Sequence, residues 1–381
     1  MKYLCPRDFR RGEMEENMIR VLHVVTYMGR GGLETMLMNY YRNIDRSRVQ
    51  FDFLVHRNFE ADYDKEILSM GGRIFHISRL VPWSRSYRKK LKNFFLEHPE
   101  YRIVHVHQDC LSSVALQCAK ECGVPVRIAH SHNRNQDKNI KYLIKLYYMK
   151  QIPKFATEYF ACSKEAGDWM FKGENYHILY NAIDASAYTY SYEKSKEIRK
   201  RLGLENNYVI GHVGRFDEQK NHTFLLDIFC EYLKNDSSAR LLLVGDGKLR
   251  TSIQDKAKSL GIYNNVIFTG VRSDVADLLQ AMDIFVFPSL YEGLGIAAVE
   301  AQASGLPCIL SDRVPIECKM TDKVEFLPLE GTLEIWTNHI MAFKNTPRLN
   351  TYEDIYKAGY DIKENAIKLQ KFYCDIDGEN K

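Results

Sequence analysis

The chain has 381 residues, of which 45% are hydrophobic and 27% are charged, and its formal net charge is +4. This length exceeds what one hydrophobic core usually supports, and the composition is that of a globular protein, so we expect two domains of ordinary size. No apolar run approaches the length of a membrane-spanning helix, and a charge this close to neutrality does not suggest a nucleic-acid partner. Nine scattered cysteines favour reduced thiols in a cytoplasmic protein over a disulfide framework.

Residues 1–17 precede the first convincing strand and lack the apolar centre of a signal peptide, so we interpret them as an N-terminal extension. From residue 18 onward, short β-branched runs alternate with helix-like segments, a pattern typical of parallel sheets covered by helices. Strands are predicted in the first half at 19–26, 51–56, 73–77, 102–107, 125–131, 157–162 and 176–180. In the second half they are predicted at 208–213, 240–244, 266–268, 284–288, 307–310 and 324–327.

The pattern therefore predicts an α/β protein with two Rossmann-like, doubly wound parallel-sheet domains. We place the first domain at 18–185 and the second at 186–352, with a linker near 182–190. The last segment, 353–381, is predicted to form a helix that packs back across the first domain.

Basic residues cluster in two segments of the first half. The first cluster is Arg85, Arg88, Lys89, Lys90 and Lys92, and the second is Lys138, Lys141, Lys145, Lys150 and Lys154. The second cluster interleaves lysines with apolar residues, as does a helix lying on an anionic membrane surface. An ordinary surface helix with its apolar stripe on the core explains the pattern equally well.

A glycine-rich turn between a predicted strand and a predicted helix carries the strongest chemical signal. Two carboxylates, Glu292 and Glu300, flank it, and Gly293 and Gly295 allow the backbone to approach a ligand closely. The amides that would face a phosphate at the helix start belong to Leu294, Gly295 and Ile296. Glu300 would lie about two turns along the helix, so the two carboxylates can accept hydrogen bonds from hydroxyls on two parts of one extended ligand. A capped turn with two solvated glutamates is the structural alternative.

A second signal follows the predicted strand at 208–213, where Gly214 precedes Arg215 and Lys220. Ligands of open parallel sheets bind at the carboxyl ends of the strands, and two cations at such an end suit a diphosphate. A surface loop with solvated charges is the alternative.

These blocks resemble family-four retaining glycosyltransferases of the two-Rossmann GT-B class, in particular the branch that assembles bacterial capsules and exopolysaccharides. The segments Leu243–Gly247, Phe268–Arg272 and Ile178–Asp184 support the resemblance, as do the turn Gly31-Gly32-Leu33-Glu34 and the strand end Arg127–Asn133. The resemblance covers most of the chain. It implies two domains that face a central cleft, with the acceptor on the first domain and the donor on the second.

The resemblance also implies a nucleotide-sugar donor, for which we expect a UDP-sugar, and a saccharide or polyprenyl-linked acceptor. Arg215 and Lys220 would neutralise the diphosphate, Glu300 would hold the ribose and Glu292 the transferred sugar. The remaining donor-side residues are Gly31, Gly32, Gly245, Val271 and Arg272, the last two near the base. Glu34, Asn133 and Asn181 are assigned to the acceptor side. The family transfers a hexosyl group with retention and needs no metal or other cofactor, and acceptors of this kind would bring a cytoplasmic enzyme to the inner face of the plasma membrane.

His130 and His132 are both candidates to hydrogen-bond the transferred sugar, because residues two apart on a strand share a face. His105 and His107 repeat this spacing on a neighbouring strand, and four histidines invite a zinc hypothesis. No carboxylate or cysteine pair stands at ligand spacing, so we expect no metal.

Three other functions compete with glycosyl transfer. Gly29, Gly31 and Gly32, with Asp52 about twenty residues on, superficially resemble a dinucleotide fingerprint, but Glu34 stands where the third glycine belongs. A sugar-nucleotide epimerase or hydrolase could use the same donor residues. A catalytically silent binding subunit is the remaining alternative.

Overall fold

The computed structural model describes residues 18–132 and 142–379, and Asn133 of the predicted site lies outside them. The chain divides into two compact units, and the first contains the chain up to Ile183 and again from Ile362. The second unit runs from Asp184 to Asp361. The predicted final segment began at residue 353, but the short helix α15 (Tyr352–Lys357) packs on helices of the second unit, so the return to the first unit begins nine residues later.

The first unit is built on a seven-stranded parallel sheet in the order β3-β2-β1-β4-β5-β6-β7. Its strands are β1 (Ile19–Val25), β2 (Val49–Val55), β3 (Ile74–His76), β4 (Ile103–Val106), β5 (Val126–Ser131), β6 (Glu158–Ala161) and β7 (His177–Ile178). Its helices are α2 (Gly32–Asn43), α3 (Asp64–Ser69), α4 (Arg85–Glu97), α5 (Ser112–Glu121), α6 (Tyr142–Met149), α7 (Lys164–Phe171) and α16 (Ile362–Glu379), with short 3-10 turns at Asp109–Leu111 and Ile152–Lys154.

The second unit has a six-stranded parallel sheet in the order β10-β9-β8-β11-β12-β13. Its strands are β8 (Val209–Val213), β9 (Arg240–Val244), β10 (Val266–Phe268), β11 (Ile284–Phe287), β12 (Cys308–Ser311) and β13 (Val324–Leu327). Its helices are α8 (Ala185–Tyr188), α9 (Tyr192–Leu202), α10 (His222–Tyr232), α11 (Arg250–Ser259), α12 (Val275–Gln280), α13 (Ile296–Ala303), α14 (Leu333–Ala342) and α15, with 3-10 turns at Tyr263–Asn265 and Ile316–Cys318.

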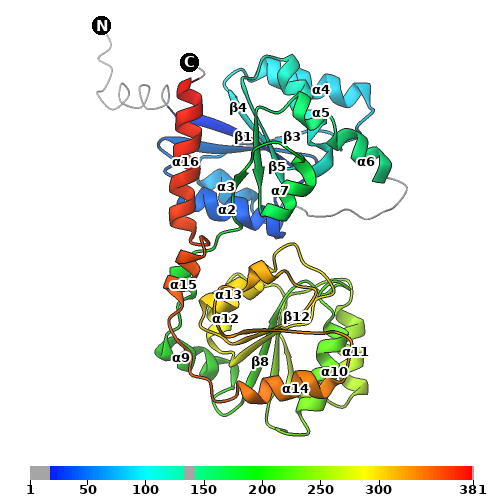
Figure 1. Ribbon diagram of the computed structural model, residues 1–381, viewed down its shortest axis with the longest axis vertical. Helices are drawn as coiled ribbons and strands as arrows, with labels where there is room; N and C mark the ends of the chain where they lie inside the picture. Colours follow the sequence, from blue (N-terminus) through cyan, green and yellow to red (C-terminus); the bar gives the residue numbers. More distant parts are fainter. Residues whose placement is uncertain (1–17, 133–141, 380–381) are drawn as a thin grey trace. The chain divides into compact units, whose positions relative to one another are not determined.

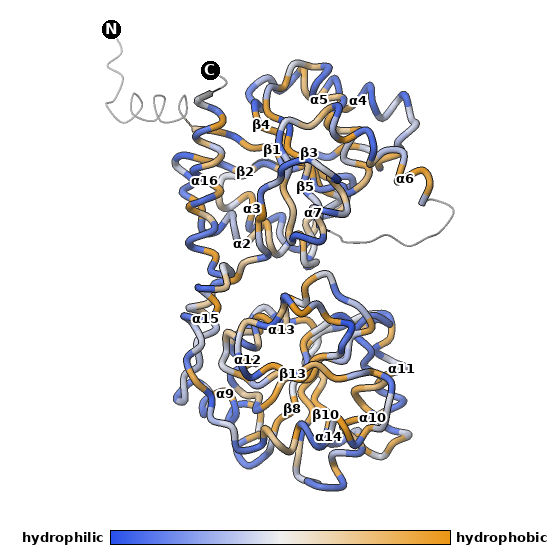
Figure 2. The backbone as a smooth tube through the Cα atoms, in the orientation of Figure 1, coloured by the Kyte–Doolittle hydropathy of each residue, from blue (hydrophilic) through white to orange (hydrophobic). Residues whose placement is uncertain are grey.

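All thirteen predicted strands are present, with ends that differ by at most two residues from the prediction. Strands β2, β4 and β11 are buried along their whole length, and β9 is buried after its first residue, because helices cover both faces of each sheet. Their sequences are accordingly near-continuous apolar runs. Figure 2 shows these runs as hydrophobic segments in the interior of each unit. In both sheets the first strand of the unit lies between its second and fourth strands, the arrangement that creates a topological switch point.

Helix α16 returns the end of the chain to the first unit. Its residues Ile362, Ala366, Leu369 and Tyr373 recur at helical spacing and are buried. The helix packs against α2, β1 and β2, and Figure 1 shows it running along this side of the first unit. Tyr373 thereby reaches the interior of the first sheet, where its hydroxyl contacts His105 at 2.7 Å.

Candidate active site

The candidate donor site lies at the switch point of the second sheet, where β8 and β11 are neighbours. The loop after β8 carries Arg215 and Lys220, and the loop after β11 carries Glu292. Because both strands are parallel, the two loops emerge at the same edge of the sheet. Their backbones are joined there, since the Leu290 amide donates to the Gln219 carbonyl over 2.8 Å.

Lys220 and Glu292 form a buried ion pair across these two loops. The Lys220 Nζ atom lies 2.5 Å from Glu292 Oε1, and the side chains are only 16% and 6% exposed. Gln219 donates to the other carboxylate oxygen over 3.2 Å, and the Lys220 ammonium lies 4.6 Å from the centre of the Phe287 ring. The two charges were predicted to contact different parts of the donor, whereas in the structure they form an ion pair with each other.

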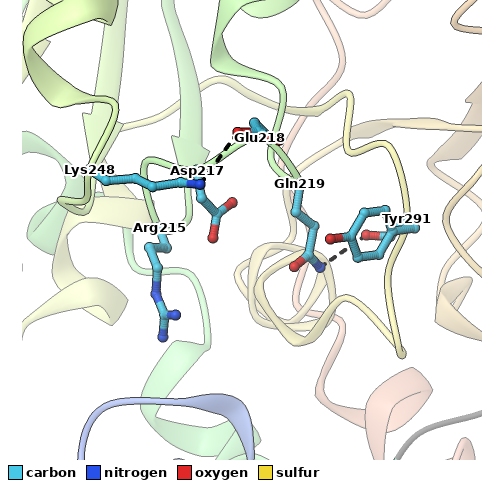
Figure 3. Close-up of a pocket in the computed structure, with 6 residues that line it drawn as sticks. All are labelled: Arg215, Asp217, Glu218, Gln219, Lys248 and Tyr291. Atoms are coloured by element: carbon cyan, nitrogen blue, oxygen red, sulfur yellow. Dashed lines mark hydrogen bonds and ion pairs between the residues drawn. The ribbon is translucent and has the colours of Figure 1, made fainter. Parts of the chain in front are cut away.

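An open pocket of about 460 Å³ adjoins this ion pair. Six residues line it: Arg215, Asp217, Glu218, Gln219, Lys248 and Tyr291. Figure 3 shows Gln219 bridged to the Tyr291 carbonyl and Lys248 paired with Glu218, while the Arg215 side chain extends away from the other five. Arg215 is exposed and makes no ion pair within residues 18–132 and 142–379, so its guanidinium is available to an anionic ligand.

The glycine-rich turn leads directly into α13. Gly295 is the N-cap residue of this helix, and its φ of +89° is a left-handed conformation that side chains rarely adopt. The first N–H groups of a helix have no acceptor inside that helix. The amides of Leu294, Gly295 and Ile296 stand at this position, before or at the start of α13. Gly293 is exposed, and a Cβ atom there would meet nothing within 4 Å. A ligand can therefore approach the backbone of the turn at Gly293.

Gly245, at the end of β9, has a structural reason to be glycine. Its φ is +138°, and a Cβ atom at this position would lie 2.0 Å from the Gly214 carbonyl oxygen. Its amide donates to the Gly270 carbonyl over 2.9 Å. Gly245 thus lets the loops after β8, β9 and β10 lie against one another.

Glu300 lies in α13 and is partly buried. It accepts a hydrogen bond from the Tyr188 hydroxyl over 2.8 Å. Burial raises the pKa of Glu300 to about 7 because removal from water disfavours the carboxylate, and the Tyr188 hydrogen bond opposes this shift. A carboxyl group that titrates near neutrality can become an acceptor when a ligand supplies hydroxyl donors.

The two residues assigned to the base lie on the loop after β10. Val271 is 61% exposed, and Arg272 forms a bidentate ion pair with Asp274 at 2.7 and 2.6 Å. Neither residue lines the pocket beside Arg215.

Three residues of this site were not identified from the sequence. Gln219 connects the two loops, Lys248 adds a second cation to the pocket, and Tyr188 contacts Glu300. In the sequence, Gln219 lies between the candidates Arg215 and Lys220, and Lys248 follows the segment Leu243–Gly247. These positions were the only indication that either residue belongs to the site. Tyr188 lies in the predicted linker, where nothing in the sequence indicated a contact with residue 300.

In the first unit, the Gly31-Gly32 turn follows β1 and begins α2. Gly31 is the N-cap residue of this helix, and the Glu34 carboxylate folds back so closely that a Cβ atom on Gly31 would lie 2.3 Å from it. A carboxylate in the first turn is favourable beside the positive end of a helix. Asn181 lies after β7, and its Oδ1 atom is buried without a hydrogen-bond partner among the described residues.

The structure distinguishes the two histidine candidates by burial. His130 is fully buried on β5, where its Nδ1 atom lies 3.0 Å from His105 Nε2. His132 follows β5, is only partly buried, and has its Nε2 atom 2.9 Å from His107 Nδ1. Of the two candidates, the structure therefore favours His132 as the residue that a ligand can reach.

Two groups of three imidazoles have ligand atoms within 4.8 Å of one another, namely His23 with His105 and His107, and His107 with His130 and His132. Three imidazoles can form a zinc site if their lone pairs converge on one point. In both groups, however, ring nitrogens face each other directly across hydrogen bonds of 2.9–3.0 Å. This geometry is that of a hydrogen-bonded chain, and the nitrogens would have to separate before an ion could enter.

The dinucleotide alternative depended on Asp52 reaching a ribose. Asp52 is fully buried in β2 and accepts two hydrogen bonds of 2.6 Å from Arg20. The Tyr101 hydroxyl and the Arg73 amide also donate to it, each over 2.7 Å. Its oxygens are occupied inside the fold, and this argues against dinucleotide binding at that carboxylate.

Of the second basic cluster, Lys145 lies in α6, Lys150 and Lys154 follow this helix, and Lys138 and Lys141 lie outside the described residues. Leu143, Ile144 and Tyr147 are 74%, 39% and 61% exposed, whereas Leu146, Tyr148 and Met149 pack on the core. Its apolar side chains are therefore divided between the core and the surface. No described helix is long and apolar enough to cross a membrane.

The family model described as "Glycosyl transferases group 1" matches residues 194–359. The chain is 36% identical over 380 residues to the putative glycosyltransferase EpsF of Bacillus subtilis, with 94% of this chain and 97% of that protein covered. It is 25% identical to the capsular polysaccharide biosynthesis glycosyltransferase CapH of Staphylococcus aureus, covering 93% and 99% of the two chains. It is also 25% identical to the Escherichia coli UDP-Gal:alpha-D-GlcNAc-diphosphoundecaprenol alpha-1,3-galactosyltransferase, covering 74% and 77%.

Among solved structures, Anabaena Alr3699/HepE in complex with UDP superposes with a TM-score of 0.77 at 17% identity, covering 93% of this chain and 99% of that one. This similarity confirms the predicted fold of two parallel-sheet α/β units. Together with the near-full-length similarity to EpsF, it shows that the chain belongs to the group 1 glycosyltransferases and has the GT-B fold.

Proposed function

We propose that this glycosyltransferase moves a sugar from a UDP-sugar, with retention, to a saccharide acceptor carried on a polyprenyl diphosphate. The product would enter an extracellular or capsular polysaccharide. The names of CapH and of the galactosyltransferase that acts on a diphosphoundecaprenol-linked sugar support this role, as does UDP in the structural neighbour. The observation that carries the proposal is the buried Lys220–Glu292 pair beside the exposed Arg215, at the switch point of the second sheet.

The donor contacts follow from the charges at this site. Arg215 and Lys220 bind the diphosphate, which replaces Glu292 as the partner of the Lys220 ammonium. Glu292 then accepts hydrogen bonds from hydroxyls of the transferred sugar, and Glu300 accepts them from the ribose. The amides at the start of α13 add partial positive charge.

These groups supply the electrostatic stabilisation that the reaction needs without a metal ion. As the bond between the sugar and the diphosphate breaks, negative charge builds on the leaving phosphate oxygen, where two side-chain cations and helix amides stabilise it. The acceptor oxygen bonds to the same face of the sugar carbon, and its proton passes to the departing phosphate. No enzyme nucleophile takes part in this route.

In the first unit, we assign His132 to a hydroxyl contact on the transferred sugar and the Gly31-Gly32 turn to the substrate as well, with Glu34 and Asn181 on the acceptor side. The exposed apolar residues of α6, interleaved with Lys145 and followed by Lys150, provide a surface for contact with anionic lipid. Such contact would hold the protein where a polyprenyl-linked acceptor is embedded.

The test is a donor-consumption assay with the purified full-length chain, a panel of UDP-sugars, EDTA, and a short-chain prenyl-diphosphate-linked N-acetylhexosamine. Release of UDP only when the acceptor is present, together with an α-linked product from an α-linked donor, supports the proposal. UDP release without acceptor would identify a hydrolase, and a new nucleotide sugar without acceptor would identify an epimerase. Nucleotide binding without turnover on any acceptor would support the silent-subunit alternative.

A further inference from the structure

Five histidines gather inside the first sheet, and the proposed function uses only one of them. His23 comes from β1, His105 from β4 and His130 from β5, while His107 and His132 follow the ends of β4 and β5. Their hydrogen bonds form two separate chains. One runs from His132 Nε2 to His107 Nδ1 (2.9 Å) and from His107 Nε2 to His23 Nδ1 (3.0 Å). The other joins Tyr373 to His105 and His105 to His130.

The rings of the first chain are electrically neutral at physiological pH. Burial lowers the pKa of His23 and of His132 to about 3, and burial with neighbouring imidazoles lowers the pKa of His107 well below its ordinary value. A neutral imidazole has one N–H group and one lone pair. His107 uses both of its nitrogens in the chain, so the atom that carries its proton decides how both neighbours are protonated.

The chain therefore has two alternative directions. If His107 donates from Nδ1, His132 accepts at Nε2 and carries its own proton on Nδ1, and His23 donates to His107. If His107 donates from Nε2, His132 must donate from Nε2 and its Nδ1 atom becomes an acceptor. The direction of the chain thus decides whether His132 offers a substrate a donor or an acceptor.

The buried end of the chain selects between these directions. His23 Nε2 is buried without a hydrogen-bond partner among the described residues, and its ring packs on Phe51 and Phe53. In the first direction His23 Nε2 is unprotonated and has an unused lone pair, and in the second direction it carries a proton and is an N–H group without an acceptor. Buried N–H groups without an acceptor are the rarer and costlier defect, so the first direction is favoured.

We propose that His107 and His23 are positioning residues that fix His132 in the tautomer protonated at Nδ1, so that it donates a hydrogen bond to a sugar oxygen of the substrate. This inference rests on the proposed function for the identity of the substrate. His132 Nε2 is bonded to His107, and His132 Nδ1 has no hydrogen-bond partner among residues 18–132 and 142–379. Nδ1 is therefore the ring nitrogen that can bond to a substrate. Because the tautomer is already set, substrate binding does not have to select it.

The first test reads the tautomer directly and needs no turnover, so it is independent of whether the proposed reaction occurs. The full chain, labelled with 13C and 15N at histidine, is measured by NMR at pH 7 without substrate, and the His132 signals are assigned by their loss in His132→Asn. We expect His132 to be protonated at Nδ1 in the wild type and to become a tautomer mixture in His107→Phe. A His132 ring protonated at Nε2 in the wild type would overturn the inference.

The second test compares two substitutions of His107 that each keep one half of the chain. An asparagine amide occupies the place of Nδ1 and can still donate to His132, whereas a glutamine amide occupies the place of Nε2 and keeps only the bond to His23. We expect His107→Gln to lower kcat about tenfold with little change in KM, and His107→Asn to stay within about threefold of wild type. Equal losses in both variants, with equal melting temperatures, would mean that His107 only fills space.

Tyr373→Phe serves as the matched control, because it removes one hydrogen bond from the second chain, which His132 does not join. We expect its kcat to stay within about twofold of wild type and the His132 tautomer to be unchanged. A tautomer change at His132 in this variant would show that the two chains act as one network and would contradict the assignment to His107 and His23.

Discussion

The two units share the order of their first six strands and differ in the side chains placed at the switch point of each sheet. In the first unit, neutral histidines joined by hydrogen bonds lie along the strands and at their carboxyl ends, and the carboxylate of Asp52, on β2, is bound inside the fold by Arg20. In the second unit, the same position carries a buried Lys–Glu pair and an exposed arginine. One topology thus places hydrogen-bonded neutral imidazoles in one unit and a pocket with charged side chains in the other. The chemistry of each unit is therefore decided by its side chains and cannot be read from the fold alone.

The largest effect is expected from replacing Asp52, a charged residue that is fully buried in the first sheet. Asp52→Asn leaves the Arg20 guanidinium, whose side chain is 12% exposed, without its carboxylate. Breaking a buried pair in this way costs about 3–5 kcal/mol, so we expect the free energy of unfolding to fall by that amount in chemical denaturation. If Asp52 is structural, nucleotide affinity in the folded variant stays unchanged, and a selective loss of nucleotide binding would revive the dinucleotide alternative.

The corresponding substitution in the second unit is Lys220→Ala. Because phosphate charge grows in the transition state, we expect kcat to fall about a hundredfold while donor affinity falls much less. The measurement is steady-state kinetics together with donor binding by calorimetry, and equal effects on both would contradict the assigned role. Since this variant removes the partner of Glu292 in a buried pair, its melting temperature is measured as well, and a protein that stays folded at the assay temperature excludes lost stability as the cause. Lys256→Ala, which removes a pair with Asp227 at 2.6 Å, is the matched control and should leave kcat unchanged.

Glu300 should give the second unit a pH dependence, because burial raises its pKa from the ordinary value of 4.5 to about 7. Between these two values the folded protein holds this proton more tightly than the unfolded chain, so the contribution of Glu300 to stability falls as pH rises through that window. If ribose hydroxyls bind the carboxylate, donor affinity should instead rise from pH 6 to pH 8. We expect Glu300→Gln to weaken donor binding about tenfold and to remove this rise, as measured by calorimetry at several pH values. Glu231→Gln, on the surface of the same unit, should retain the wild-type profile, and a profile unchanged in Glu300→Gln would show that another group titrates.

The smallest effect is expected at α6. Replacing both Leu143 and Tyr147 by glutamine should lower cosedimentation with phosphatidylglycerol vesicles about threefold, because these exposed side chains would enter the interface. Ile367→Gln, which changes a similarly exposed apolar residue on α16, should not alter binding. Equal binding by all three proteins would argue against α6 as a membrane surface.

The fold could be predicted almost entirely from the sequence, because a strand buried on both faces must be a short apolar run and each of these runs is bounded by turn residues. The candidate donor residues could also be identified, since they follow the strands at which ligands of such sheets bind. The contacts that these residues make with one another and with the rest of the fold could not be predicted. Lys220 and Glu292 lie 72 positions apart, and only the packing of two loops reveals that they neutralise each other. Tyr188 contacts Glu300 because α8 packs on α13, and the histidine chains depend on ring orientations that no spacing encodes.

We propose above that the second unit binds a nucleoside diphosphate sugar through its own cations, Arg215 and Lys220. The most direct test is the melting temperature of the full chain with UDP-, GDP- and ADP-sugars in the presence of EDTA, for the wild type and for Arg215→Ala. A bound ligand stabilises the folded state by mass action, so we predict a higher melting temperature with UDP-sugars in EDTA and a smaller increase in the variant. No increase with any nucleotide sugar, or an increase that requires a divalent cation, would contradict the account.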